Sequence, residues 1–226
     1  MRNQPTLTPM PRESKTARQN RVNQISALLQ ATYPNAHCEL NFSTPLELLI
    51  ATILSAQCTD KQVNTVTAGL FKKYLAVADY ANADPLTFET DIRCIGLFRN
   101  KAKNIQACCR SLIEDHGGEV PRTMEALVQL AGVGRKTANV VLGCAFKLAA
   151  GIVVDTHVAR LSGRLHFTAA TQPIEIESDL VNLIPKDRWI DFSHWLIWHG
   201  RRRCGARKPN CTECEISSLC PSNQTV

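Results

Sequence analysis

Apolar residues recur at helical spacing along almost the whole chain. One stripe near the N-terminus comprises Val22, Ile25, Leu28 and Leu29. A second periodic segment opens at Pro45 and runs to Leu54. Proline is well tolerated there, because a helix has no internal partner for the N–H groups of its first turn. Asp60 is predicted to cap a third helix that extends toward Tyr74.

The same periodicity predicts helices over most of the remaining chain. They are expected at about 85–93, 99–115, 123–130, 135–148, 156–165, 174–184 and 188–203. Alternation typical of strands is nearly absent, and the apolar run 152–154 is too short to found a sheet. The pattern therefore predicts an all-α fold with short loops.

Two segments depart from this amphipathic pattern. Residues 140–148 are apolar on nearly every face, which predicts a helix buried all round in the middle of a bundle. Residues 1–15 carry three prolines and no apolar period, which predicts a disordered basic tail.

Composition and charge narrow the classes of protein. The 226 residues are 44% hydrophobic and 20% charged, as in ordinary globular proteins, and the net charge is +6. Five cations and no acid lie between positions 201 and 208: Arg201, Arg202, Arg203, Arg207 and Lys208. A run this polarised favours an anionic partner such as nucleic acid.

Cysteine usage and apolar content indicate a reduced compartment. The N-terminus lacks the apolar core of a signal peptide, and no apolar stretch is long enough to span a bilayer. We therefore expect a cytosolic protein without a membrane partner. Six scattered cysteines are expected to be small buried hydrophobes: Cys38, Cys58, Cys94, Cys108, Cys109 and Cys144.

The other four cysteines, Cys204, Cys211, Cys214 and Cys220, have the spacing C-x6-C-x2-C-x5-C. Four thiolates bind either zinc or an iron–sulfur cluster. Structural zinc usually takes two C-x2-C pairs, and only Cys211 and Cys214 form one here, so the spacing leans toward iron–sulfur. His194 and His199 stand five residues apart, which places them on different helix faces and disfavours a histidine zinc site.

A glycine-rich hairpin is predicted at Leu130–Ala138. Gly132 and Gly134 permit a tight turn and a close backbone approach to a ligand. The next helix starts near Arg135, so its first amides point at the same spot. We expect this hairpin to bind phosphate without reading a base, the alternative being a plain helix–helix turn.

Lys136 and Asp155 are the candidate catalytic residues. The positive end of a helix favours the neutral amine of Lys136, which can form a Schiff base with an aldehyde-like carbon, and partial burial would act in the same direction. The alternative is that Lys136 only neutralises phosphate. Asp155 precedes a helix start and reads as an N-cap, but its carboxylate can also stabilise a developing sugar cation.

Taken together, these residues resemble the endonuclease III family of DNA glycosylases, within the helix-hairpin-helix glycosylase superfamily. The matching stretches are 54–60, 95–98 with 101–102, 118–121, 130–138, 154–157, 194–197 and the four cysteines. They run in family order from about residue 20 to about residue 220.

The resemblance implies a role for each matched residue. Lys136 matches the lysine that attacks C1′ of the damaged nucleoside and leads to cleavage of the abasic site by β-elimination, and Asp155 matches the aspartate that assists it. Gln57 matches the residue that fills the gap left by the flipped nucleotide, and Leu97 matches an apolar wedge. The four cysteines match the ligands of a [4Fe–4S] cluster, whose expected role is to hold the cationic loop against phosphates.

The resemblance also implies the architecture and the substrate. A six-helix barrel-like domain with the helix-hairpin-helix is expected at 38–148, and a cluster domain at 16–37 plus 149–226, the two flanking a DNA-binding cleft. The expected partner is double-stranded DNA with oxidised pyrimidines or abasic sites, bound by a monomer that associates with the nucleoid in a bacterium.

Two departures and two rival functions accompany the resemblance. Ala131 stands where the family usually has proline, and Phe98 stands where tyrosine is common. One rival is a monofunctional mismatch glycosylase of the same superfamily, which lacks a lysine at the position of Lys136. The other is a non-catalytic DNA-binding module, which has no use for both Lys136 and Asp155.

Overall fold

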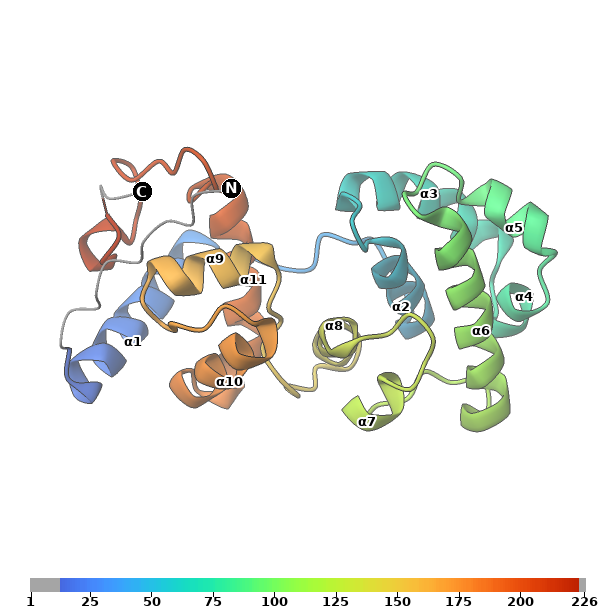
Figure 1. The fold of residues 1–226 in the computed structure, drawn as a ribbon, viewed down its shortest axis with the longest axis horizontal. Coiled ribbons are helices and arrows are strands. Elements are labelled where there is room, and N and C mark those ends of the chain that lie inside the picture. The colour runs from blue at the N-terminus through green and yellow to red at the C-terminus, as the bar shows by residue number, and fades with distance from the viewer. Residues whose placement is uncertain (1–12, 224–226) are drawn as a thin grey trace. The chain divides into compact units, whose positions relative to one another are not determined.

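Every regular element of the protein is helical. A computed structural model describes residues 13–223, and no strand occurs within that range (Figure 1). The all-α prediction is confirmed. The chain divides into two compact units, one spanning His37–Val153 and the other joining 13–36 to 154–223. The predicted tail lies outside the described residues up to position 12. At its end, Ser14 already caps the first helix.

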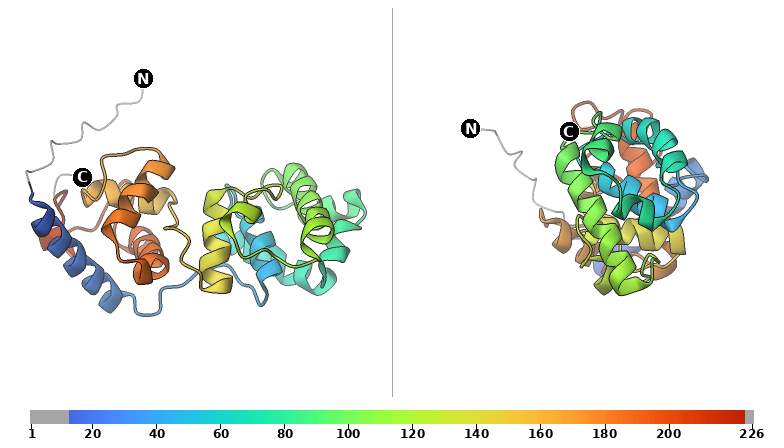
Figure 2. Two further views of the ribbon diagram at one scale, coloured as in Figure 1. Left: turned by 90° about the horizontal axis from the view of Figure 1, so that it is seen from below. Right: turned by 90° about the vertical axis from the view of Figure 1, so that its right-hand side faces the viewer.

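The unit His37–Val153 contains seven helices. They are α2 (Pro45–Leu54), α3 (Asp60–Lys73), α4 (Val77–Ala81), α5 (Pro85–Asp91), α6 (Phe98–His116), α7 (Met124–Leu127) and α8 (Arg135–Phe146). Helix α6 packs along α4 and α5, while α2 packs against α8 (Figures 1 and 2). Their apolar faces form one core, to which α2 contributes nearly all of its side chains from Leu48 to Leu54.

Several helix ends differ from the sequence prediction. Thr59, not Asp60, caps α3, since the Thr59 hydroxyl accepts a hydrogen bond from the amide of Gln62 and Asp60 is the first helical residue. The helix predicted at 123–130 is the single turn α7, after which the chain turns into the hairpin. Helix α4 has five residues, too few to produce a recognisable period.

The segment 140–148 is not buried all round. Helix α8 ends at Phe146, and Lys147 takes a left-handed conformation with φ of 57°. Leu148 is 43% exposed and Phe146 is half-buried, whereas Val141 and Leu142 are in the core. The helix therefore buries one broad face, although its sequence is apolar on the other face too.

The second unit joins the two ends of the chain. It contains α1 (Lys15–Thr32), α9 (Thr156–Arg164), α10 (Pro173–Leu183), the short 3-10 helices η1 (Lys186–Arg188) and η2 (Ser217–Leu219), and α11 (Trp189–Arg202). Helix α11 packs against α9 and α1. No helix within 13–223 is both long and apolar enough to cross a membrane.

Candidate functional site

The hairpin at 130–138 has the tight turn that its glycines predict. Gly132 has φ of +78°, which favours glycine, and a Cβ built on it would lie 3.0 Å from Cβ of Asn104 on α6. Gly134 is the N-cap of α8 and has no side chain to cap the helix. A helix start of this kind, following a turn with positive φ, suits a bound anion.

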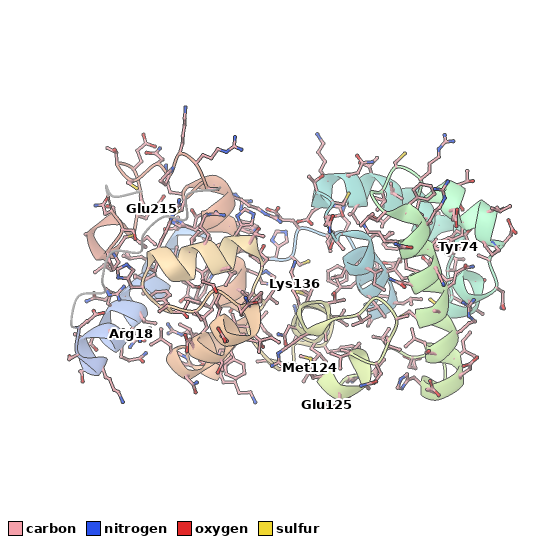
Figure 3. All side chains as sticks on the ribbon, viewed as in Figure 1. Arg18, Tyr74, Met124, Glu125, Lys136 and Glu215 are labelled. Carbon is pink, nitrogen blue, oxygen red and sulfur yellow. The ribbon has the colours of Figure 1, made fainter. Side chains whose placement is uncertain are left out.

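Lys136 lies in the first turn of α8, directly after this turn (Figure 3). Its side chain and that of Arg135 are exposed. Burial therefore does not act on Lys136, and the partial burial considered from the sequence is not observed. The amine is accessible to a substrate and lies at the positive end of a helix.

Asp155 is the N-cap of α9. Its Oδ1 atom accepts hydrogen bonds from the amides of His157 and Val158, both at 2.8 Å. The capping role is therefore confirmed. Both of these bonds use the same carboxylate oxygen, and Asp155 is half-buried. The cap fixes the carboxylate at the start of α9, so a structural and a chemical role are compatible.

Gln57 and Leu97 share an unusual backbone conformation. Their φ angles are +56° and +58°, a left-handed region that side chains rarely adopt, least of all leucine. Both side chains are exposed, Leu97 by 58%, which excludes a core role for this leucine. The two loops are neighbours, because a Cβ built on Gly96 would lie 4.0 Å from the carbonyl oxygen of Gln57. The structure thus presents a polar and an apolar side chain on adjacent turns.

The four C-terminal cysteines surround one cavity. Cys204, Cys211, Cys214 and Cys220 all line it, together with residues of α9 and α11. Burial raises the pKa of the Cys214 thiol to about 11 and raises that of Cys220. Buried thiols of this kind lose their protons to a bound metal, which supplies the missing positive charge. No set of three or more His, Cys, Asp or Glu side chains between residues 13 and 223 converges as the ligands of a single metal ion would.

Two arginines on α9, absent from the sequence prediction, hold the loop that carries Cys204. Arg164 donates to Sγ of Cys204 at 3.1 Å and to the carbonyl oxygens of Gly205 and Ala206. Arg160 donates to the carbonyl oxygen of Cys204 at 2.9 Å. Their spacing of four residues places both on one face of α9. This spacing is the feature of the sequence from which their shared role could have been predicted.

His199 also contacts this cavity from inside α11. Burial lowers its pKa to about 4, so the imidazole is neutral and has one N–H. Tyr33, whose pKa burial raises to about 12, remains a hydroxyl donor and lies 3.1 Å from Nδ1. Nε2 of the same ring lies 3.5 Å from Sγ of Cys214. The imidazole of His199 thus lies between the hydroxyl of Tyr33 and the sulfur of Cys214.

The cations of the run 201–208 have different surroundings. Arg203 is half-buried and forms ion pairs with Glu213 and Glu215, at 3.0 and 2.9 Å. Arg202 lies over the ring of Trp198. By contrast, Arg207 and Lys208 extend from the loop as exposed side chains, and Arg201 is exposed at the end of α11. Arg203 therefore braces the cysteine loop, while Arg207 and Lys208 face outward.

The scattered cysteines only partly follow the sequence prediction. Cys108, Cys109 and Cys144 are buried, and burial raises the pKa of Cys108 and Cys109 to about 12, as expected of inert core thiols. Cys94 is exposed, so its predicted burial is wrong. It follows the end of α5 in a turn, where the helical period gives no information about burial.

Known proteins resemble this chain over nearly its whole length. Residues 50–186 match the model of the HhH-GPD superfamily of base excision DNA repair proteins. Endonuclease III of Synechocystis sp. is 53% identical over 92% of this chain and 95% of its own length. The chain belongs to the endonuclease III family. Endonuclease III of Bacillus subtilis is 50% identical over 85% of this chain and 88% of its own.

A solved structure of the family has the same fold. It is a trapped covalent intermediate of endonuclease III with DNA, described as an estranged-adenine complex, with a TM-score of 0.87 and 45% identity. The alignment covers 92% of this chain and 97% of that one. The helices that carry the predicted site residues are therefore those of an endonuclease III fold.

The structure groups the predicted site residues by unit. The loops of Gln57 and Leu97 and the hairpin with Lys136 belong to the unit His37–Val153. Asp155 and the cysteine loop belong to the other unit, where α9 begins with Asp155 and ends with Arg164 against the cysteine loop. Each unit thus carries one of the two candidate catalytic side chains.

Proposed function

We propose that this protein is a bifunctional DNA glycosylase of base excision repair that removes oxidised pyrimidines and cleaves the resulting abasic site. The observation that carries the proposal is the position of Lys136. It is an exposed amine in the first turn of α8, directly after a glycine turn suited to a phosphate, in a chain of the endonuclease III family. Lys136 and Asp155 together favour catalysis over phosphate neutralisation alone, because a binding module has no use for the carboxylate of Asp155.

Lys136 acts as the nucleophile. Its amine forms a bond to C1′ of the damaged nucleoside while the bond from C1′ to the base breaks; the amine gives up a proton, and the base takes one up as it leaves. Opening of the sugar ring yields a Schiff base between Nζ and C1′. Loss of a proton from C2′ then expels the 3′ phosphate, and hydrolysis of the imine releases the enzyme. The lysine thus serves both the glycosylase and the lyase steps.

Asp155 supports these steps with a fixed negative charge. Its Oδ1 is held by two amides of α9, so the carboxylate is oriented before substrate arrives. Oδ2 then stabilises positive charge on the sugar as the base departs, and accepts protons in later steps. Capping and catalysis use different oxygens of the same group.

DNA is held by the backbone and by cations. The amides at the start of α8 bind a phosphate, and exposed Arg207, Lys208 and Arg201 contact other phosphates without reading sequence. Chemistry at C1′ requires the nucleotide to leave the base stack, which costs a few kcal/mol. Gln57 and Leu97 offset this cost by occupying the space that the flipped nucleotide leaves.

The cysteine cavity fits a [4Fe–4S] cluster. Cys204, Cys211, Cys214 and Cys220 would hold it through their thiolates, and Arg164 would donate a hydrogen bond to the sulfur of Cys204. When bound, the cluster supplies a structural crosslink. The chain's own contribution is to hold Arg207 and Lys208 on a loop of fixed shape.

Replacing the nucleophile tests the proposal. Lys136→Ala is expected to lose borohydride-trapped adduct and strand cleavage on duplex DNA with an oxidised pyrimidine by ~10³-fold or more, because no other group supplies the amine. Lys72→Ala, which removes an exposed lysine of α3, should retain wild-type activity. Adduct that persists in Lys136→Ala would contradict the assignment. Activity confined to mismatched thymine or uracil, in a panel of lesions, would contradict the substrate class.

Metal analysis tests the cluster. Protein purified without oxygen should contain about four iron atoms per chain and no zinc in the same proportion. It should also show the visible absorption of an iron–sulfur cluster. One zinc per chain would instead identify a four-cysteine zinc site and contradict this part of the proposal.

A further inference from the structure

Lys101 of α6 is a buried lysine. It is 4% exposed and lies on the apolar stripe of α6 that includes Ile105 and Leu112. Burial lowers its pKa, and no carboxylate in the described part of the chain pairs with it. Burying an ammonium is costly unless its protons find acceptors. A lysine in this position therefore indicates a specific contact.

That contact is with the end of α2. The Lys101 ammonium donates to the carbonyl oxygens of Leu54 at 2.9 Å and Ala56 at 2.6 Å. These are carbonyls at the negative end of the helix, where a cation is favoured. Because Ala56 precedes Gln57, the lysine fixes the backbone immediately before the polar side chain proposed to enter the DNA.

The same lysine lies one helical turn from Leu97. The amide of Lys101 donates to the carbonyl oxygen of Leu97 at 3.1 Å, and Leu97 caps α6 in its left-handed conformation. Left-handed backbone at a glutamine and a leucine persists only where surrounding contacts enforce it. The ammonium of Lys101 supplies such contacts next to Gln57, and its backbone amide supplies one to Leu97.

Helix α6 also reaches the hairpin. Asn104 lies three residues after Lys101, and its Cβ would be 3.0 Å from a Cβ at Gly132. Leu97, Lys101 and Asn104 follow one another at spacings of four and three residues, which places them along one face of α6. The helix thus ties the two turns to the segment that carries Lys136, all within one unit.

We propose that Lys101 is a positioning residue for extrusion of the damaged nucleotide, because its ammonium holds the turn of Gln57, which neighbours the turn of Leu97, in the conformation that enters the duplex. The inference rests on the proposed function. A wedge is effective when it is ordered before binding, since binding then incurs no cost of ordering it. Lys101 does not touch the reacting atoms, so its removal should affect extrusion and spare the chemistry.

Lys101→Met tests this assignment, with Lys103→Met as the matched control. Methionine keeps the apolar stem and removes the ammonium, whereas Lys103 is an exposed lysine two residues along the same helix. The single-turnover rate on a duplex lesion should fall about tenfold or more in Lys101→Met. A fall of this size is expected because flipping the nucleotide costs a few kcal/mol and the variant loses part of the contacts that offset this cost. Trapping on a single-stranded abasic oligonucleotide, which needs no extrusion, should stay within about twofold of wild type.

A fluorescent base gives a readout independent of catalysis. Wild-type protein bound to a duplex with 2-aminopurine opposite a tetrahydrofuran abasic analogue should change the fluorescence as the wedge displaces the stacked base. Lys101→Met should reduce that change and Lys103→Met should not. In the double variant with Gln57→Ala, loss of Lys101 should add little, because both changes disable the same wedge. Lys101→Gln, which keeps one donor, replaces the methionine variant if the latter does not fold.

Three results would overturn the inference. They are an unchanged duplex rate in Lys101→Met, an equal loss on single-stranded and duplex DNA, and full additivity with Gln57→Ala. Failure of the wild type to trap any abasic DNA would count against the proposed function instead, and the fluorescence comparison would still decide the role of Lys101.

Discussion

Gly200 shows how a single residue sets the approach of two helices. It lies in α11 facing α9, and a Cβ built on it would be 2.9 Å from both Cβ and Nδ1 of His157. Real Cβ atoms do not approach a neighbouring Cβ this closely, so any side chain here forces α9 and α11 apart. Because α9 carries Asp155 and Arg164, the spacing at Gly200 also determines where those groups lie.

Gly200→Ala should therefore destabilise the protein by about 1–3 kcal/mol, the usual cost of overpacking a core. Gly163→Ala is the matched control, because a Cβ at Gly163 of α9 meets no atom within 4 Å. There the gain in helix propensity should stabilise by about 0.5–1 kcal/mol. Urea denaturation of both variants measures the difference. Equal stabilities would contradict the packing argument.

The backbone conformation and burial of individual residues were the features that the sequence predicted least well. The place of Lys136 at a helix start and the capping role of Asp155 follow from local sequence, because both depend on neighbours within three positions. The left-handed turns at Gln57 and Leu97 do not, since neither residue prefers that conformation. For Lys101, the sequence contains one indication of a special role: it is a lysine on an otherwise apolar stripe of α6.

Among the helices, α9 has the clearest dual function. Its first turn orients Asp155, and its last residue, Arg164, donates three hydrogen bonds into the loop around Cys204. Two of those bonds go to backbone carbonyls, so the arginine fixes loop shape as well as contacting a sulfur. The helix connects a candidate catalytic carboxylate to the cysteine cavity within one unit.

Arg164→Ala should therefore lower the iron content of the purified protein and its melting temperature, because the cysteine loop loses three hydrogen bonds and two of its carbonyls lose this partner. Arg207→Ala, an exposed arginine of the same loop, should keep the iron. It should weaken DNA binding and reduce the slope of log K against log salt by about 1. Iron analysis and salt titrations separate the two roles. Loss of iron in Arg207→Ala would contradict this division.

At the same scale, periodicity predicted the long helices, overestimated the length of the short helix α7 and missed α4. Helices such as α2 and α6 carry enough apolar positions to define their period. Helix α4 depends instead on Asp79, which accepts bonds from the amides of Leu75 and Ala76, and such a local cap leaves little trace in an apolar pattern.

For the whole molecule, the sequence predicted the all-α class and the family, because seven short motifs occur in the family's order. That 13–36 and 154–223 belong to one unit around α1 and α11 was expected only from the family resemblance, because periodicity gives no information on contacts such as Tyr33 with His199 across 166 positions. The predicted chemistry draws on both units, with Lys136 in one and Asp155 in the other.

The central claim is that the Lys136 amine forms the covalent intermediate. The most direct measurement is to trap the wild-type protein on abasic duplex DNA with borohydride, digest the adduct and locate the modified peptide by mass spectrometry. The account predicts one adduct, on Nζ of Lys136 in the peptide that begins α8. A modification on another lysine, or no adduct at all, would contradict it.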